Sequence, residues 1–215
     1  QALTVWSRHI PWDIEHFALS ADGLRLIAVA NANGRDEMHV FDATTGKELE
    51  RPALAVGALG GGRWHETQRH TLAFSLNSPQ SPGDVYTWDA DTGKTERWTT
   101  AAAAAGVNPD TFTSPELVQI KSFDGLDISA WLFRPDAAKF PGKRPVLVNF
   151  HGGPEGQSTV RFMGRYNYFL NEMGIAVLMP NVRGSHGYGK TYLDLDNGYL
   201  RKDSVKDGGA FLQWI

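Results

Sequence analysis

The segment that ends in His151-Gly152-Gly153-Pro154 contains residues whose types and order could stabilise negative charge. The apolar run Val146 to Phe150 comes directly before it and predicts a buried strand. The glycines leave backbone N–H groups unshielded by side chains. Such groups can form an oxyanion hole, which binds the charge that develops on a carbonyl oxygen during acyl transfer. The segment therefore predicts part of an acyl-transfer site.

The sequence lacks the usual pattern around the serine nucleophile that such a site serves. A nucleophile elbow has the pattern Gly-x-Ser-x-Gly, and the chain contains no such pattern. The nearest match is Gly184-Ser185-His186-Gly187, where Arg183 stands in place of the first glycine of the pattern. Ser185 is therefore not expected to be a nucleophile.

Residues 184–191 also fit the phosphate-binding pattern G-x-x-x-x-G-K-[ST]. That pattern requires a helix directly after the lysine, and the sequence from Tyr192 to Gly198 favours a helix poorly. No apolar strand ending in Asp follows that could hold magnesium. Nucleotide binding therefore stays as the alternative to a glycine-rich loop beside the oxyanion motif.

The first half of the chain repeats itself. Val40-Phe41-Asp42-Ala43-Thr44-Thr45-Gly46-Lys47 returns 47 residues later as Thr87-Trp88-Asp89-Ala90-Asp91-Thr92-Gly93-Lys94. Each copy predicts a strand that ends in a tight turn. A period of about 40–50 residues with about four short strands per unit indicates β-propeller blades. Two blades do not close a propeller, so we expect this half to belong to a larger one.

The second half predicts an α/β arrangement. Asp124-Gly125 joins two β-rich segments, Leu117–Phe123 and Leu126–Phe133, as a hairpin. The strand Val146–Phe150 should be followed by a helix, by a second buried strand at Ile175–Met179, and by a last helix capped by Ser204. The first helix is expected to carry one apolar face and to end at Gly174; the face comprises Phe162, Tyr166, Phe169, Leu170 and Met173. A strand–helix–strand unit implies a parallel sheet.

Composition limits the classes of partner. The 215 residues carry a net charge of −3 and 41% hydrophobic residues, so neither nucleic acid nor an anionic membrane is an expected partner. No apolar run reaches the length of about 18 residues that a membrane span needs. The absence of cysteine excludes a disulfide framework and a thiolate metal site.

Together these motifs resemble the prolyl oligopeptidase family of serine peptidases, in particular its acylaminoacyl-peptidase and dipeptidyl-peptidase-like branches. The resemblance rests on four stretches: Ser122 to Ile128, His151 to Pro154, Pro180 to Gly189, and Asp203 to Asp207 leading to Trp214-Ile215. It implies β-propeller blades at residues 1–113 and the start of an α/β-hydrolase domain at residues 114–215, truncated before the nucleophile elbow.

The resemblance also implies roles for individual residues. Gly153 would supply an oxyanion-hole N–H and Gly152 would shape the turn. The remaining active-site-loop residues would be His151, Pro154, Arg183, Gly184 and Tyr188. The catalytic serine, aspartate and histidine are all expected beyond Ile215, so the chain alone is expected to be inactive.

The expected partners are a short peptide substrate and the remainder of the same protein, which would hold the other blades and the rest of the hydrolase domain. No cofactor and no metal are expected. A non-catalytic relative, in which both domains form a binding module, stays as an alternative.

Overall fold

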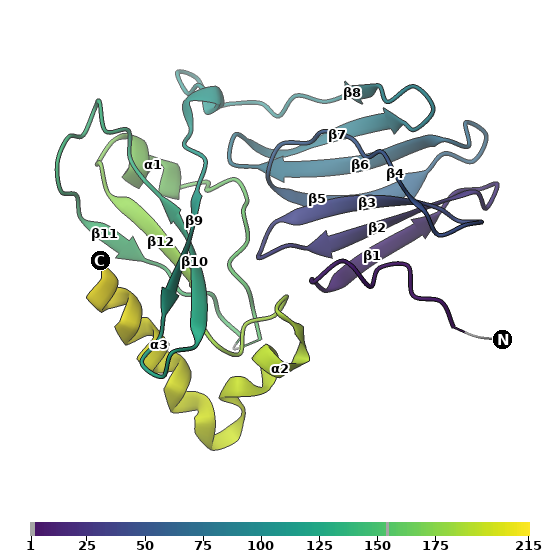
Figure 1. The fold of residues 1–215 in the computed structure, drawn as a ribbon. Coiled ribbons are helices and arrows are strands. Elements are labelled where there is room, and N and C mark those ends of the chain that lie inside the picture. The colour runs from purple at the N-terminus through teal and green to yellow at the C-terminus, as the bar shows by residue number, and fades with distance from the viewer. Residues whose placement is uncertain (1–2, 154) are drawn as a thin grey trace.

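Two four-stranded antiparallel sheets form the first half of the protein (Figure 1). The computed structural model describes residues 3–153 and 155–215. The first sheet has the order β1-β2-β3-β4: Ile14–Leu19, Arg25–Asn31, Asp36–Asp42 and Glu48–Leu49. The second has the order β5-β6-β7-β8: Ala58–Trp64, Thr71–Ser78, Ser81–Asp89 and Thr95–Arg97. Each sheet is thus a simple meander of sequential strands.

The repeated sequence forms the same turn in both sheets. Asp42 Oδ1 accepts hydrogen bonds from Thr44 N (2.9 Å) and Thr45 N (2.8 Å). Asp89 Oδ1 accepts equivalent bonds, both of 2.9 Å, from the residues two and three positions later. The glycines at positions 46 and 93 have φ of 74° and 72°, a conformation that side chains disfavour. The 47-residue repeat is therefore also a structural repeat.

The two sheets pack face to face through a shared apolar core. Its buried members come from strands of both sheets: Ile27, Met38, Val40, Trp64, Leu72, Phe74 and Trp88. Hydrogen bonds between turns also connect the two sheets. His70 Nε2 lies 2.9 Å from Asp22 Oδ2 of the first sheet, and His70 Nδ1 lies 2.6 Å from Asp91 Oδ2. The two repeats therefore form one packed unit.

A third sheet follows a connector, residues 98–115, that contains the short 3-10 helix η1 (Pro109–Thr111). Its order is β11-β12-β10-β9, and the strands are β9 Glu116–Lys121, β10 Asp127–Phe133, β11 Val146–Val148 and β12 Ala176–Asn181. β11 and β12 are parallel, as the sequence predicted, and the other pairs are antiparallel. β11 is shorter than the expected Val146–Phe150, and in this sheet it is an edge strand.

Helices cover both faces of the third sheet (Figure 1). Ile128, Ala130 and Leu132 of β10 pack toward Phe211 of α3, whereas Trp131 and Phe133 pack on the other face with α1 and the segment before it. The helical elements are α1 Tyr166–Asn171, α2 Gly189–Leu193, η2 Asp194–Asp196, η3 Gly198–Leu200 and α3 Arg201–Trp214. The alternation along β10 is that of a strand buried on both faces.

Two expectations about the helices are wrong. α1 begins only at Tyr166, so Phe162 lies before it, and the helix ends before Gly174. Ser204 does not cap α3, because the helix begins at Arg201 and Ser204 Oγ donates to Arg201 O at 2.8 Å.

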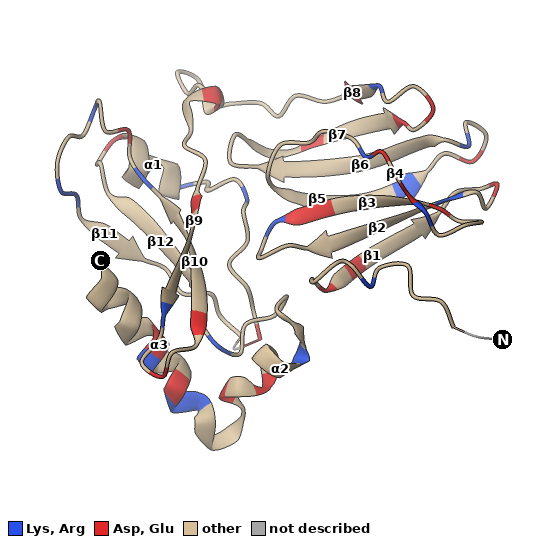
Figure 2. Cartoon of the chain, viewed as in Figure 1, with Lys and Arg blue, Asp and Glu red and all other residues tan. Residues whose placement is uncertain are grey.

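Charged residues of both signs are distributed over all three sheets and α3 (Figure 2). Within the described part of the chain, no helix combines the length and the apolar character needed to cross a membrane.

Candidate functional site

The glycine loop, defined here as residues 151–153 and 155–157, follows β11 closely. Gly153 has φ of +127°, and a Cβ atom there would lie 2.7 Å from Gly156 N, so only glycine fits. Gly152 has no such constraint, because a Cβ atom there would meet nothing within 4 Å. Both glycines are exposed, and Pro154 lies outside the described residues. Among the residues that the structure describes, none accepts a hydrogen bond from Gly153 N–H.

His151 joins the glycine loop to the tyrosine loop, defined here as residues 182–189. His151 Nε2 lies 2.9 Å from Ser185 Oγ, which donates its proton to Val182 O at 2.6 Å. Ser185 is fully buried, at 0% exposure, so its hydroxyl cannot reach a substrate. This serine–histidine pair therefore holds two loops together and does not form a nucleophile.

Arg183, at the start of the tyrosine loop, lies inside an ion network. Its guanidinium donates to both oxygens of Asp124 (2.8 and 2.9 Å) and to the fully buried Asp207 (2.9 to 3.2 Å). The hydrogen bond from Arg183 holds the pKa of Asp124 down at about 2, and the same bond raises the pKa of Arg183. Asp207 also accepts from Arg183 N at 2.9 Å. Arg183 thus fixes the tyrosine loop to α3 and to the β9–β10 turn.

Gly184 is also constrained by its surroundings. Its φ is +87°, and a Cβ atom would lie 2.2 Å from the carboxyl carbon of the buried Asp196. The tyrosine loop therefore passes directly against η2.

Tyr188 connects this loop to the first sheet. Its hydroxyl donates to Asn33 Oδ1 at 2.6 Å and accepts from Asn181 Nδ2 at 2.8 Å. Burial raises the pKa of Tyr188. The sequence placed Tyr188 in the loop but did not identify Asn33, which lies 155 residues away along the chain.

The same loop is poorly suited to bind a phosphate. Its backbone N–H groups donate to acceptors of the protein: Gly184 N to Tyr192 O, Ser185 N to Val182 O, His186 N to Gly156 O and Gly189 N to Asp13 Oδ2. A helix begins at Gly189, but it has only 5 residues and ends at Leu193, within the stretch that the sequence predicted to favour a helix poorly. A phosphate-binding loop needs free N–H groups, so the geometry disfavours nucleotide binding.

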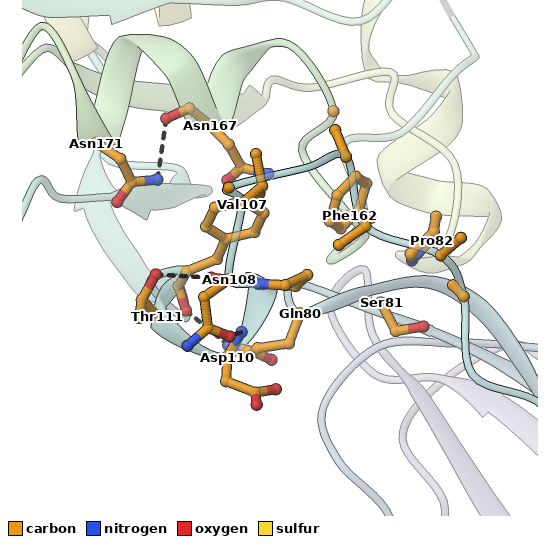
Figure 3. A pocket seen from close by; sticks show the side chains of 18 of the residues that line it. Gln80, Ser81, Pro82, Val107, Asn108, Asp110, Thr111, Phe162, Asn167 and Asn171 are labelled. Carbon is orange, nitrogen blue, oxygen red and sulfur yellow. Dashed lines mark hydrogen bonds between the residues drawn. The ribbon is translucent and has the colours of Figure 1, made fainter.

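A cavity of about 1000 Å³ lies elsewhere, between the second sheet, the connector and α1 (Figure 3). Its lining is mostly apolar and includes Val107, Phe112, Phe162 and Tyr168. None of its lining residues belongs to the glycine loop or the tyrosine loop. The cavity is therefore separate from the site built around Gly153.

One cluster has the residue types of a metal site. Ligand atoms of His9, His39 and Glu48 lie within 4.8 Å of one another. His9 Nε2 and His39 Nδ1 each lie 2.7 Å from a Glu48 carboxylate oxygen. His39 Nε2 is buried with no partner, so a metal at Nδ1 would leave an unpaired N–H where metal-binding histidines usually donate to an acceptor. The hydrogen bonds from His9 and His39 to Glu48 account for the cluster better than a metal centre does.

Known proteins with similar sequences are peptidases. An uncharacterized peptidase of Bacillus subtilis, YuxL, is 32% identical over 142 residues, which are 63% of this chain and 20% of that protein. Prolyl oligopeptidase A of Galerina marginata is 27% identical over 190 residues, 87% of this chain and 24% of the relative. No family model matches the chain. The chain thus spans about a quarter or less of the length of these two relatives.

Solved structures with a fold similar to that of this chain were also found. Prolyl oligopeptidase B from Galerina marginata, bound to a 35mer hydrolysis and macrocyclization substrate, superposes with a TM-score of 0.81 at 20% identity. The match covers 95% of this chain and 28% of that one. The sequence and structure matches together relate this chain to a segment of the prolyl oligopeptidase family of serine peptidases.

Proposed function

We propose that the chain is part of a serine peptidase, with residues 1–113 forming blades of a β-propeller and residues 114–215 beginning an α/β-hydrolase domain. The two four-stranded meanders with the same repeated turn support the first assignment. The parallel β11–β12 pair, with helices on both faces of its sheet, supports the second.

In this proposal the glycine loop forms half of an oxyanion hole, with Gly153 N–H as the donor and Gly152 beside it. The observation that carries the proposal is that Gly153, an exposed residue, has an N–H with no acceptor among the described residues and a backbone conformation that only glycine adopts easily. One such donor is worth about 2.7–4 kcal/mol to the transition state of acyl transfer.

The nucleophile, its base and the orienting acid lie outside this sequence, which has no Gly-x-Ser-x-Gly elbow and whose Ser185 is buried. The substrate is a short peptide, as the 35mer-bound neighbour suggests, and the remainder of the protein is the partner of this segment. β11 offers the edge on which a further strand of the sheet can pair.

Labelling by a fluorophosphonate, which reacts with activated serines, tests the proposal on the full-length protein that carries this chain. We expect labelling, and we expect Gly153→Ala to lower kcat by about 100- to 1000-fold because the donor is displaced. Gly209→Ala, on the exposed face of α3, is the control and should leave kcat unchanged. A full-length protein that folds but resists labelling would favour a non-catalytic binding module.

A further inference from the structure

The turn between β2 and β3 extends from the first sheet to the half of the protein that contains the third sheet. Asn33, in this turn, has φ of 62°, although it is not a glycine. Its side-chain oxygen accepts from Tyr188 OH (2.6 Å) and Ser129 Oγ (2.9 Å), and its backbone oxygen accepts from Trp131 Nε1 (3.0 Å). A disfavoured backbone conformation is thus maintained by three hydrogen bonds to the other half of the protein.

The backbone of the tyrosine loop packs against this turn without a gap. Gly187 has φ of +89°, and a Cβ atom there would lie 2.5 Å from Gln157 Nε2 and 2.6 Å from Asn31 Nδ2. Asn31 Nδ2 in turn donates to Gln157 Oε1 at 2.7 Å. The end of β2 and the turn that follows it therefore contact both the tyrosine loop and the end of the glycine loop.

Further bonds connect the tyrosine loop to the residues on either side of Gly153. His151 Nε2 lies 2.9 Å from Ser185 Oγ, and His186 N donates to Gly156 O at 3.0 Å. The loop that carries the Gly153 N–H is thus held at positions 151, 156 and 157. Two of these contacts come from the tyrosine loop and one from Asn31.

We infer that Asn33 and Tyr188 are positioning residues for the Gly153 N–H, so that the first sheet sets the geometry of the oxyanion hole. This inference rests on the proposed function. An oxyanion donor must lie about 2.7–3.1 Å from the charged oxygen. A displacement of about 1 Å caused by a distant substitution can cost about 100-fold in rate.

The test uses the full-length protein with Tyr188→Phe, which removes the hydroxyl, and Asn33→Gly, which removes the side chain and tolerates the positive φ. The matched control is Asn77→Ala in the second sheet. Asn77 Oδ1 also accepts a bond across the two halves, from Phe162 N at 2.7 Å, but it contacts neither loop. The readouts are kcat and KM for a peptide ester, and amide hydrogen exchange in residues 151–158.

We expect Tyr188→Phe and Asn33→Gly each to lower kcat by about 10- to 100-fold with KM changed less than about twofold. The double variant should lose less activity than the product of the two single effects, because both substitutions break the bond between Tyr188 and Asn33. Exchange in residues 151–158 should rise in these variants and stay unchanged in Asn77→Ala.

Unchanged exchange in both Tyr188→Phe and Asn33→Gly would overturn the inference, as would an equal rise in Asn77→Ala. An active wild-type enzyme whose kcat does not respond to either substitution would also overturn it, while leaving the proposed function intact. If the wild type is not labelled by the fluorophosphonate, the proposed function fails, and the positional link between sheet and loop is still decided by the exchange data.

Discussion

Asp207→Ala should destabilise the part of the protein around the third sheet much more than Asp203→Ala does, although both aspartates lie on α3 and pair with a cation. The Asp207 carboxylate is fully buried and accepts from Arg183 N (2.9 Å), from the Arg183 guanidinium (2.9 to 3.2 Å) and from Ser122 Oγ. Its loss leaves a guanidinium that is only 5% exposed with Asp124 as its remaining partner.

Removing one partner of a buried ion pair costs about 3–5 kcal/mol when the other charge is left poorly compensated, and Asp124 compensates Arg183 only in part because its side chain is 41% exposed. Asp203 pairs with Lys206 at 2.7 Å, but the lysine side chain is 55% exposed. Surface pairs of this kind contribute about 0–1 kcal/mol. The two substitutions should therefore differ by at least about 2 kcal/mol.

Amide hydrogen exchange in the full-length protein gives the free energy of opening for each helix and strand separately. We expect the opening free energy of β10 and α3 amides to fall by about 3–5 kcal/mol in Asp207→Ala and by less than about 1 kcal/mol in Asp203→Ala. Equal changes in the two variants would refute the assignment of Arg183 and Asp207 as a buried structural pair.

Three further predictions follow from the same region. The pKa of Asp124 is lowered from 3.8 to about 2, so its pair with Arg183 stabilises the protein fully above about pH 4, and this contribution is lost as the pH falls through 2. Melting temperatures measured from pH 5 to pH 2 should therefore fall more steeply for the wild type than for Asp124→Asn. Parallel curves for the two proteins would contradict this prediction. Fluorophosphonate should label a serine other than Ser185 in the full-length protein, because the Ser185 hydroxyl is buried; a label located on Ser185 by peptide mass spectrometry would identify Ser185 as the nucleophile instead. Gly187→Ala should destabilise by at least about 1 kcal/mol because of its positive φ, whereas Gly209→Ala, in a helix with open space around it, should stabilise by about 0.5–1 kcal/mol; thermal unfolding measures both, and shifts of the same sign would contradict the reasoning.

Features encoded by a few neighbouring residues could be predicted from the sequence. The turns after Asp42 and Asp89 form because the aspartate oxygen and the glycine φ act within five residues. The hairpin at Asp124-Gly125 is present as well, although its turn runs from Ser122 to Leu126. Local chemistry decides such turns, so a single sequence suffices.

Features that depend on contacts between the halves could not be predicted. The apolar spacing from Phe162 onward favours a helix, but Val160 N donates to Gly34 O and Phe162 N donates to Asn77 Oδ1. These bonds tie residues 160–162 to the first two sheets, and Gly164 has φ of 52°, which a right-handed helix does not allow, so α1 begins only at Tyr166.

In the candidate site, too, the features set by neighbouring residues could be predicted and those set by distant contacts could not. The sequence predicted the positions of both loops, the one with His151 and Gly153 and the one with Tyr188, because each loop carries its own glycines. Asn33 was missed, since its partner is 155 residues away and a turn asparagine is common. The sequence places Asp207 only in the stretch from Asp203 to Asp207, and the fold alone reveals that it is buried against Arg183.

The left-handed backbone of Asn33 limits which substitutions this position can accept. Glycine, asparagine and aspartate tolerate φ near 62° best, and a side-chain acceptor for two hydroxyl groups is present only in the last two. The two requirements together leave two residue types out of twenty. A homologous sequence with any other residue at the equivalent position would have lost the bond to the tyrosine loop, whatever its overall identity.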